Sequence, residues 1–269
     1  MKKPTTITCI GAGNVATRLV VALHDKGLQV RQIISKHGQS AARLARLVNA
    51  PVHGHDMSKL DDESDFYLVA VKDDDIPVVL KDLPFCLTGD QVLMHASGSF
   101  NENELADYAR HVGCFYPLQT FRKDIKTDLL HTPFLINGND GETLQKIHTL
   151  ASLISDHVKV YSFIDRHNIH VAAVIVNNFT NHLFTMTKSY CEKNQVDFND
   201  LWPLIEEGIR NARRFGPENV QTGPAIRGDN TTITNHLRKL EGLPDLANIY
   251  KLLTVSIQNW HHHENPEGI

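Results

Sequence analysis

Short apolar runs alternate with amphipathic stretches through the first part of the chain. An apolar run over 7–10 predicts a buried strand, and apolar residues spaced three and four apart predict a helix over 14–26. The same alternation recurs further along, and strands separated by helices favour parallel pairing with right-handed crossovers. The predicted strands are 7–10, 29–35, 66–71, 92–95, 114–116, 134–137 and 158–162, and the predicted helices are 14–26, 41–49, 76–81 and 102–111.

The pattern changes near residue 162. Beyond it the apolar residues keep a helical spacing, with no convincing strand pattern. The sequence therefore predicts two domains: an α/β domain with a doubly wound parallel sheet over residues 1–161, then an all-α domain over 162–269. The predicted helices of the second domain cover 167–193, 200–214, 231–240 and 246–260.

A glycine-rich turn between the first predicted strand and helix is the strongest functional signal. It reads Gly11-Ala12-Gly13-Asn14-Val15-Ala16. Gly11 allows a tight turn, Gly13 allows backbone to approach a pyrophosphate, and Ala16 allows the helix to pack on the strand. The pyrophosphate would lie on the helix N-terminus, against Gly11, Gly13, Asn14 and Val15. The turn predicts a Rossmann-type dinucleotide site; a plain tight turn is the alternative.

The end of the second strand bears on which dinucleotide binds. An NAD site usually has an acidic residue there, bonded to the ribose 2′-hydroxyl. This chain has no acid at that point, and Ser35 and Lys36 are suited to a 2′-phosphate. The prediction is therefore NADP in preference to NAD, with Val71 as a further cofactor contact. In the alternative interpretation, Lys36 is a solvated surface residue.

Polar residues that interrupt apolar segments are the candidate catalytic groups. His95 and Ser97 end a strand at the edge where doubly wound sheets bind ligands, although Ser97 is also suited to cap a turn. Asn178, next to another asparagine in a predicted helix, is suited to orient nicotinamide or substrate, or to belong to a structural polar cluster. Arg227 is suited to bind a substrate carboxylate, while nearby Asp229 would cap a helix or pair with Arg227.

Composition and charge narrow the function classes. There are 27 Lys and Arg against 31 Asp and Glu, a formal net charge of −4, which argues against a general nucleic-acid binder. No apolar run approaches the length of a membrane span, and no signal-peptide core is found, so a cytoplasmic protein is expected. The four cysteines form no paired motif, and the His167/His170 spacing lacks a carboxylate pattern. No metal site is predicted.

Several segments together resemble known families. Gly11–Ala16, Ser97-Gly98 and Asn177-Asn178 resemble the β-hydroxyacid dehydrogenase and pyrroline-5-carboxylate reductase superfamily. Tyr116-Pro117-Leu118 is similar to the His-Pro-Met segment of prephenate dehydrogenases, with Tyr in place of His. Over nearly the whole chain the sequence resembles a bacterial family of NADP oxidoreductases with a Rossmann-like N-terminal domain and a helical C-terminal domain of unknown function. The segments that carry this last resemblance are Ser97–Ser99, Pro117–Phe121, Asn177-Asn178 and Gly223–Asp229.

The resemblance implies a reaction, and this chain departs from the pattern of β-hydroxyacid dehydrogenases at one position. β-Hydroxyacid dehydrogenases carry a lysine three residues before the asparagine pair, where this chain has Val174. Valine transfers no proton, so we expect His170, one turn earlier, to stand in for the lysine. The expected function is NADP-dependent reduction of a small carbonyl or imine compound in an interdomain cleft, by a homodimer as in related reductases. A non-catalytic NADP-binding sensor or scaffold is the alternative.

Overall fold

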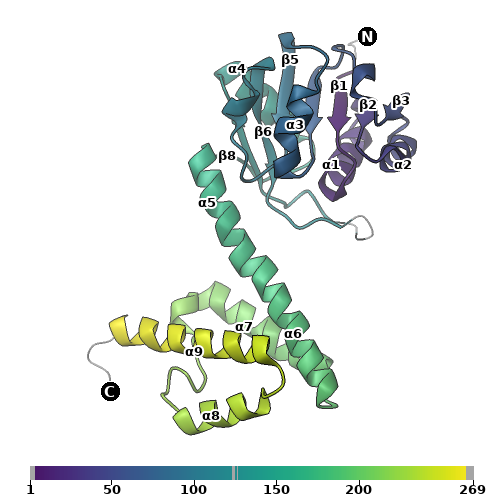
Figure 1. The fold of residues 1–269 in the computed structure, drawn as a ribbon. Coiled ribbons are helices and arrows are strands. Elements are labelled where there is room, and N and C mark those ends of the chain that lie inside the picture. Colours follow the sequence, from purple (N-terminus) through teal and green to yellow (C-terminus); the bar gives the residue numbers. More distant parts are fainter. Residues whose placement is uncertain (1–3, 123–124, 126, 265–269) are drawn as a thin grey trace. The chain divides into compact units, whose positions relative to one another are not determined.

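The computed structural model describes residues 4–122, 125 and 127–264 (Figure 1). The chain divides into two compact units, one up to Ile175 and one from Val176. The first unit is built from a sheet and helices, and the second is helical. The compact units divide later in the chain than the predicted domain boundary after residue 161, which stays a prediction.

One mixed sheet forms the centre of the first unit. Within the described residues, eight strands pair in the order β3-β2-β1-β4-β5-β6-β7-β8. The strands from β3 to β6 are parallel, β7 runs antiparallel to β6, and β8 is parallel to β7. The order from β3 to β6 is the doubly wound order that the sequence predicts. The bounds are β1 Thr6–Ile10, β2 Gln29–Ile34, β3 Val52–Gly54, β4 Phe66–Val69, β5 Leu87–His95, β6 Ala109–Pro117, β7 Phe134–Gly138 and β8 Val158–Val160.

Helices cover both faces of this sheet because its strands are apolar on both faces. In β4, Phe66 and Leu68 join an apolar cluster with side chains of α1, α2 and α4, while Tyr67 and Val69 join a cluster with side chains of α3. The α/β sheet followed by an all-α region is therefore confirmed. The helical segments of this unit are α1 Asn14–Asp25, α2 Gly38–Val48, α3 Ile76–Lys81, α4 Gly141–Ser152 and α5 Phe163–Ala173, with the 3₁₀ turns η1 Met57–Lys59, η2 Asp73–Asp75 and η3 Glu102–Leu105.

The predicted helix over 102–111 is wrong. Only the short turn η3 forms, capped by the Asn101 side chain, and the chain then enters β6 at Ala109. The Tyr108 carbonyl accepts a hydrogen bond from the Leu87 amide at 2.9 Å, and Ala109 pairs with Leu87. Pairing with β5 therefore overrides a local spacing that suits a helix equally well.

Two elements and one strand direction were not predicted. The two elements are the short edge strand β3 and the helix α4, although the sequence of α4 contains the signals of a helix. Asp140 caps α4 by accepting from the Thr143 amide at 2.7 Å, and Ile147 and Ala151 are buried on one face. Strand β7 reverses direction because the described residues between β6 and β7 (118–122, 125 and 127–133) contain no crossover helix.

The second unit consists of helices that follow the predicted pattern closely. The predicted helix 167–193 begins in the first unit as α5, and it continues as a π-helical segment η4 (Val174–Phe179) and as α6 (Thr180–Lys193). No helix in the described part of the chain is both long and apolar enough to cross a membrane. The remaining elements are η5 Phe198–Leu201, α7 Trp202–Phe215, η6 Pro217–Asn219, α8 Asn230–Lys239 and α9 Pro244–Glu264.

Candidate functional site

The turn after β1 is built around a glycine that no other residue replaces without strain. Gly11 has a φ of 121°, and a Cβ at this position would lie 2.2 Å from the carbonyl oxygen of Ala70. The Gly11 amide donates to the Ile34 carbonyl at 2.7 Å. The turn is therefore held against the ends of both neighbouring strands, β2 and β4, and only glycine permits this approach.

The N-terminus of α1 is open to an anion. Gly13 is the N-cap, and among the described atoms nothing lies within 4 Å of a Cβ built on it. The first turn of α1 contains no acidic residue, and no side chain in the described structure caps it. Asn14 is exposed and Val15 half-buried in that turn. The free amides and the helix dipole together suit a phosphate group.

A cavity of about 290 Å³ lies at the ends of β1 and β2. Four predicted cofactor residues line it: Gly11, Ser35, Lys36 and Val71. Apolar side chains that would accept a flat base form much of its wall, and Lys36 adds a positive charge. The other residues that line the cavity could not be predicted from the sequence; they are Ile10, Ile34, His55, Met57, Asp75, Val78, Val79 and Asp82.

His95 is buried at the end of β5 and is neutral near pH 7. Its Nδ1 accepts a hydrogen bond from the Ser97 amide at 3.1 Å, which places the proton of the neutral ring on Nε2. Burial, reinforced by the positive charge of Arg166, lowers the pKa of His95 to about 3. His95 therefore positions the Ser97 turn and is unsuited to proton transfer as an imidazolium.

This depressed pKa predicts a loss of stability in acid. The pKa of an unfolded histidine is about 6.5, so between that pH and about 3 only the unfolded chain binds the proton. The contribution of neutral His95 to the free energy of unfolding is complete above pH 6.5 and is lost as the pH falls toward 3. Between pH 7.5 and 4.5 we expect the free energy of unfolding to fall by about 2.5 kcal/mol more in the wild type than in His95→Asn. Urea denaturation at the two pH values measures this difference, and equal losses would contradict it.

Ser97 caps the turn that follows β5. Its hydroxyl oxygen accepts from the Ser99 amide at 3.1 Å and from the Phe100 amide at 3.0 Å. Ser99 in turn donates through its hydroxyl to the Asp73 carboxylate. The structure thus places Ser97 in the capping role that the sequence left open, at the strand edge where ligands bind.

Tyr116 and His170 form a hydrogen-bonded pair at the same strand edge. The Tyr116 hydroxyl lies 2.9 Å from His170 Nδ1. Gly98 permits this packing, because a Cβ there would lie 2.6 Å from His170 Nδ1 and 2.9 Å from Tyr116 Cζ. Burial, with smaller contributions from Cys114 and Asp73, raises the pKa of Tyr116 to about 12. The phenol therefore keeps its proton throughout the neutral range.

A buried ion pair anchors the helix that carries His170. Arg166 is fully buried on α5, and its Nη2 donates to the Phe100 carbonyl and to Glu102 Oε2, each at 2.6 Å. Removing one partner of such a pair typically costs about 3–5 kcal/mol, because the other charge stays buried. His170 follows Arg166 by one helical turn, so this anchor holds it beside Tyr116. Arg166 precedes the predicted helix 167–193 by one residue, and nothing in the sequence pattern indicated this role.

The remaining predicted residues follow α5 in the chain. Asn178 is exposed in the π-helical segment η4, a helix form that often occurs at functional sites, and Val174 begins that segment. Arg227 is exposed in the loop before α8, and Asp229 caps α8 by accepting from the Thr232 amide at 3.0 Å. Asn178 and Arg227 belong to the second unit, and their predicted roles stay predictions.

Comparison with known proteins identifies the family. A protein from Bacteroides fragilis described as "putative NADP oxidoreductase BF3122" is 33% identical, with a TM-score of 0.86; the match covers 95% of this chain and 98% of that one. The chain belongs to the same NADP oxidoreductase family. Residues 6–94 match a family model described as "NADP oxidoreductase coenzyme F420-dependent", and residues 132–257 match a domain of unknown function. No curated protein matches the chain.

More distant structures share the fold of this NADP oxidoreductase family. Protein TM1727 from Thermotoga maritima is 22% identical with a TM-score of 0.75, covering 94% of this chain and 98% of that one. A reductive aminase from Aspergillus terreus, in complex with NADPH and ethyl levulinate, is 12% identical with a TM-score of 0.72, covering 97% of this chain and 95% of that one. The 33% identical relative confirms the predicted family, and NADP, the predicted cofactor, is the one that the family's descriptions name.

Proposed function

We propose that this chain is an NADPH-dependent reductase of small carbonyl or imine compounds, with Tyr116 as its proton donor. The observation that carries the proposal is the Tyr116–His170 pair, held 2.9 Å apart at the carboxyl edge of the sheet. Gly11 follows β1, Gly98 follows β5 and Tyr116 lies near the end of β6, all on parallel strands. In doubly wound sheets this edge binds the ligands.

The residues at the glycine turn suit NADP. Gly11, Gly13, Asn14 and Val15 would hold the pyrophosphate through backbone amides at the start of α1. Ser35 and Lys36 would contact the 2′-phosphate beside the cavity at the ends of β1 and β2. When bound, the cofactor supplies the hydride, and the protein supplies position and protons.

Tyr116 and His170 are suited to general acid catalysis. If His170 Nδ1–H donates to the Tyr116 hydroxyl oxygen, the phenol's own proton remains free for the substrate. The phenolate left after transfer would keep the hydrogen bond from His170. An alkoxide forming from a carbonyl is a stronger base than a phenolate, so proton transfer from Tyr116 is favourable despite its raised pKa. This pair would supply the proton that β-hydroxyacid dehydrogenases take from a lysine, at the position where this chain has Val174.

A substrate screen tests the function. NADPH oxidation is followed by absorbance with a panel of keto acids, ketones, and ketone–amine mixtures or cyclic imines. The proposal expects at least one compound class to drive oxidation in the wild type and to lose most of its rate in Tyr116→Phe. A non-catalytic sensor would bind NADPH with no substrate-dependent oxidation across the panel.

Cofactor selectivity gives a second prediction. Lys36 is exposed at the cavity, where its ammonium group would face the 2′-phosphate that distinguishes NADPH from NADH. Lys36→Glu should weaken NADPH binding by about 10- to 100-fold, since a charge-assisted contact becomes a repulsion, and should leave NADH binding nearly unchanged. Fluorescence titration with both nucleotides measures this. Parallel losses for the two would argue against a 2′-phosphate contact at Lys36.

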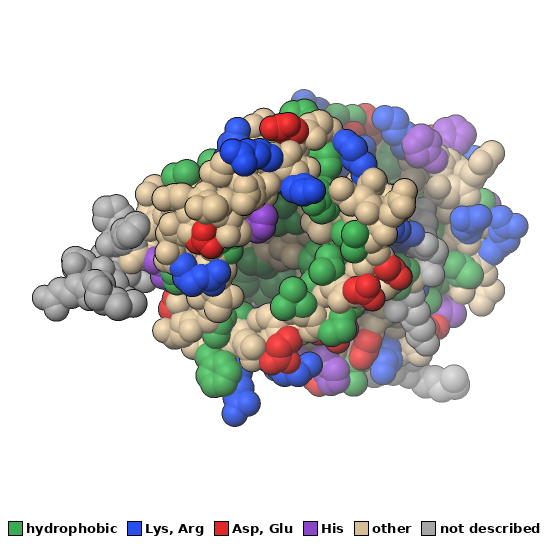
Figure 2. Space-filling view, turned by 90° about the horizontal axis from the view of Figure 1, so that it is seen from below, with side chains coloured by type: hydrophobic (Ala, Val, Ile, Leu, Met, Phe, Trp, Pro, Cys, Tyr) green, Lys and Arg blue, Asp and Glu red, His purple; other side chains and the backbone are tan. Residues whose placement is uncertain are grey.

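The homodimer expected from related reductases belongs to the same proposal. Large apolar side chains on the helices of the second unit are exposed, and Figure 2 shows apolar side chains at the surface among charges of both signs. Burying such side chains against a second copy would be favourable. Sedimentation equilibrium should therefore give about twice the 30.2 kDa chain mass, and a monomer at micromolar concentration would contradict this. The exposed residues are Val176, Phe179, Trp202, Leu204, Ile209, Leu252, Leu253, Val255 and Trp260.

A further inference from the structure

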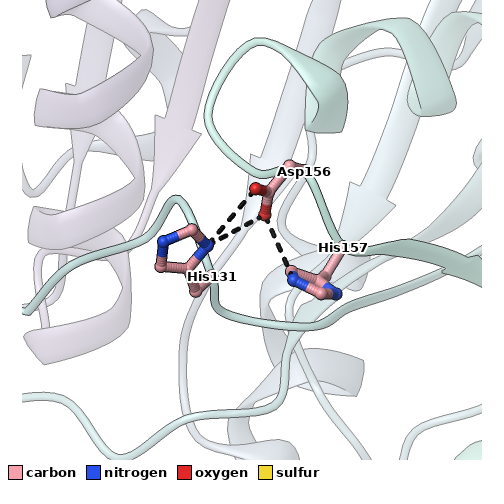
Figure 3. A group of neighbouring side chains, drawn as sticks. All are labelled: His131, Asp156 and His157. Atoms are coloured by element: carbon pink, nitrogen blue, oxygen red, sulfur yellow. Dashed lines mark hydrogen bonds and ion pairs between the residues drawn. The ribbon is translucent and has the colours of Figure 1, made fainter.

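We propose that His131, Asp156 and His157 form a binding site for a divalent transition-metal ion, with Zn²⁺ the ion that suits them best. These three residues, the His–Asp–His cluster, lie on two loops of the first unit. Figure 3 shows both imidazole rings beside the one carboxylate, with the dashed lines from both rings meeting at Asp156. The site is separate from the proposed NADP-dependent reaction and does not depend on it.

The distances within the cluster would allow its ligand atoms to share one ion. His131 Nδ1 lies 3.3 Å from each oxygen of Asp156, and His157 Nε2 lies 3.4 Å from Oδ1. A charge-assisted hydrogen bond would be shorter, at about 2.7–2.9 Å. Ligand atoms at about 2.0–2.1 Å from a tetrahedral zinc ion lie about 3.4 Å from one another. One ligand atom from each residue, all within 4.8 Å of one another, can therefore converge on one ion after small side-chain rotations.

The backbone already holds the two loops together. The Asp156 amide donates to the Leu130 carbonyl at 2.9 Å, and the Phe134 amide donates to the His157 carbonyl at 2.9 Å. The His157 amide also donates to Ser155 Oγ at 3.0 Å. These bonds fix the spacing of the Cα atoms, so an ion would need side-chain rotation and little backbone movement. Metal binding would then cross-link the segments that lead into β7 and β8.

The ligand chemistry selects the class of ion. Two imidazole nitrogens and one carboxylate oxygen suit Zn²⁺, Cu²⁺ or Ni²⁺, whereas Mg²⁺ and Ca²⁺ prefer all-oxygen sites. The three side chains are 50% exposed or more, which leaves room for water as a fourth ligand and for exchange with solvent. Sequence spacing gives no sign of this site, because the strand β7 and the helix α4 separate His131 from Asp156.

Calorimetric titration of the full chain with ZnCl₂ at pH 7.5 tests the proposal. The sequence also contains three consecutive histidines, 261–263, so the wild type is compared with a variant in which these three are replaced by Asn. We expect the tail variant to bind one Zn²⁺ with micromolar affinity. Adding His131→Asn and His157→Asn should remove that ion, whereas adding His148→Asn, an exposed histidine on α4, should not. Binding that survives the double substitution, or that vanishes with the tail histidines alone, would overturn the site.

Two further measurements address the ligand set. Asp156→Asn, which keeps the side-chain shape and removes the charge, should weaken Zn²⁺ binding at least tenfold. Co²⁺ bound to the tail variant should show visible absorption bands that Zn²⁺ abolishes. Absence of these bands together with an unchanged affinity in Asp156→Asn would contradict the proposed coordination.

Discussion

Gly13→Asp is expected to abolish tight NADPH binding without destabilising the protein. In the structure nothing described lies within 4 Å of a Cβ at this N-cap, so an aspartate side chain fits. Aspartate is also a favourable N-cap, worth a few tenths of a kcal/mol over glycine. Its carboxylate would, however, occupy the amides of α1 and repel the pyrophosphate. We expect the Kd for NADPH to rise about 100-fold or more, which corresponds to about 2.7 kcal/mol, with an unchanged or slightly raised Tm.

The control for this substitution is Gly13→Asn. Asparagine has the same shape and also caps helices well, but it brings no negative charge. Its loss of NADPH affinity should be at least tenfold smaller than that of the aspartate variant. Equal losses of NADPH affinity in the two variants would mean that the size of the new side chain, and not its charge, weakens binding. Full NADPH binding in both variants would contradict the placement of the pyrophosphate at the start of α1, and with it the proposed cofactor site.

Tyr116→Phe is expected to lower kcat for the reductase reaction by about 10²–10³-fold, the usual contribution of a general acid. The ring would still fill the space beside Gly98 and His170, so NADPH binding and the fold should be preserved. The stability cost should be about 1 kcal/mol for the lost hydrogen bond. Stopped-flow single turnovers with the best substrate from the screen measure the chemical step directly.

His170→Gln and the pH profile separate catalysis from packing. Losing the imidazole should lower kcat by about tenfold, less than losing the phenol itself, because His170 acts through Tyr116.

Since burial raises the pKa of Tyr116 to about 12, the proton is present below that pH and lost only above it. The wild-type rate should therefore show no decline from this group between pH 7 and 10. A Tyr116→Phe enzyme with wild-type kcat would exclude Tyr116 as the donor.

The local sequence determined much of this protein. Strand–helix alternation predicted the doubly wound order, and the apolar spacing beyond residue 162 predicted the helical region. The backbone of the turn Gly11–Ala16 could be predicted because its requirements are local: a positive φ at Gly11 and open space at Gly13. Ser35, Lys36 and Val71 line one cavity with Gly11 because the ends of parallel strands share one edge, and their contact with the cofactor stays a prediction.

Only the tertiary structure decided which polar groups meet. Whether residues 102–111 form a helix or a strand depended on pairing with β5, which a single segment does not encode. Tyr116 meets His170 because α5 packs where Arg166 also reaches Glu102, and the His131–Asp156–His157 cluster forms because two loops lie side by side. Such contacts join residues far apart in the chain, so their energies appear only once the fold has brought the partners together.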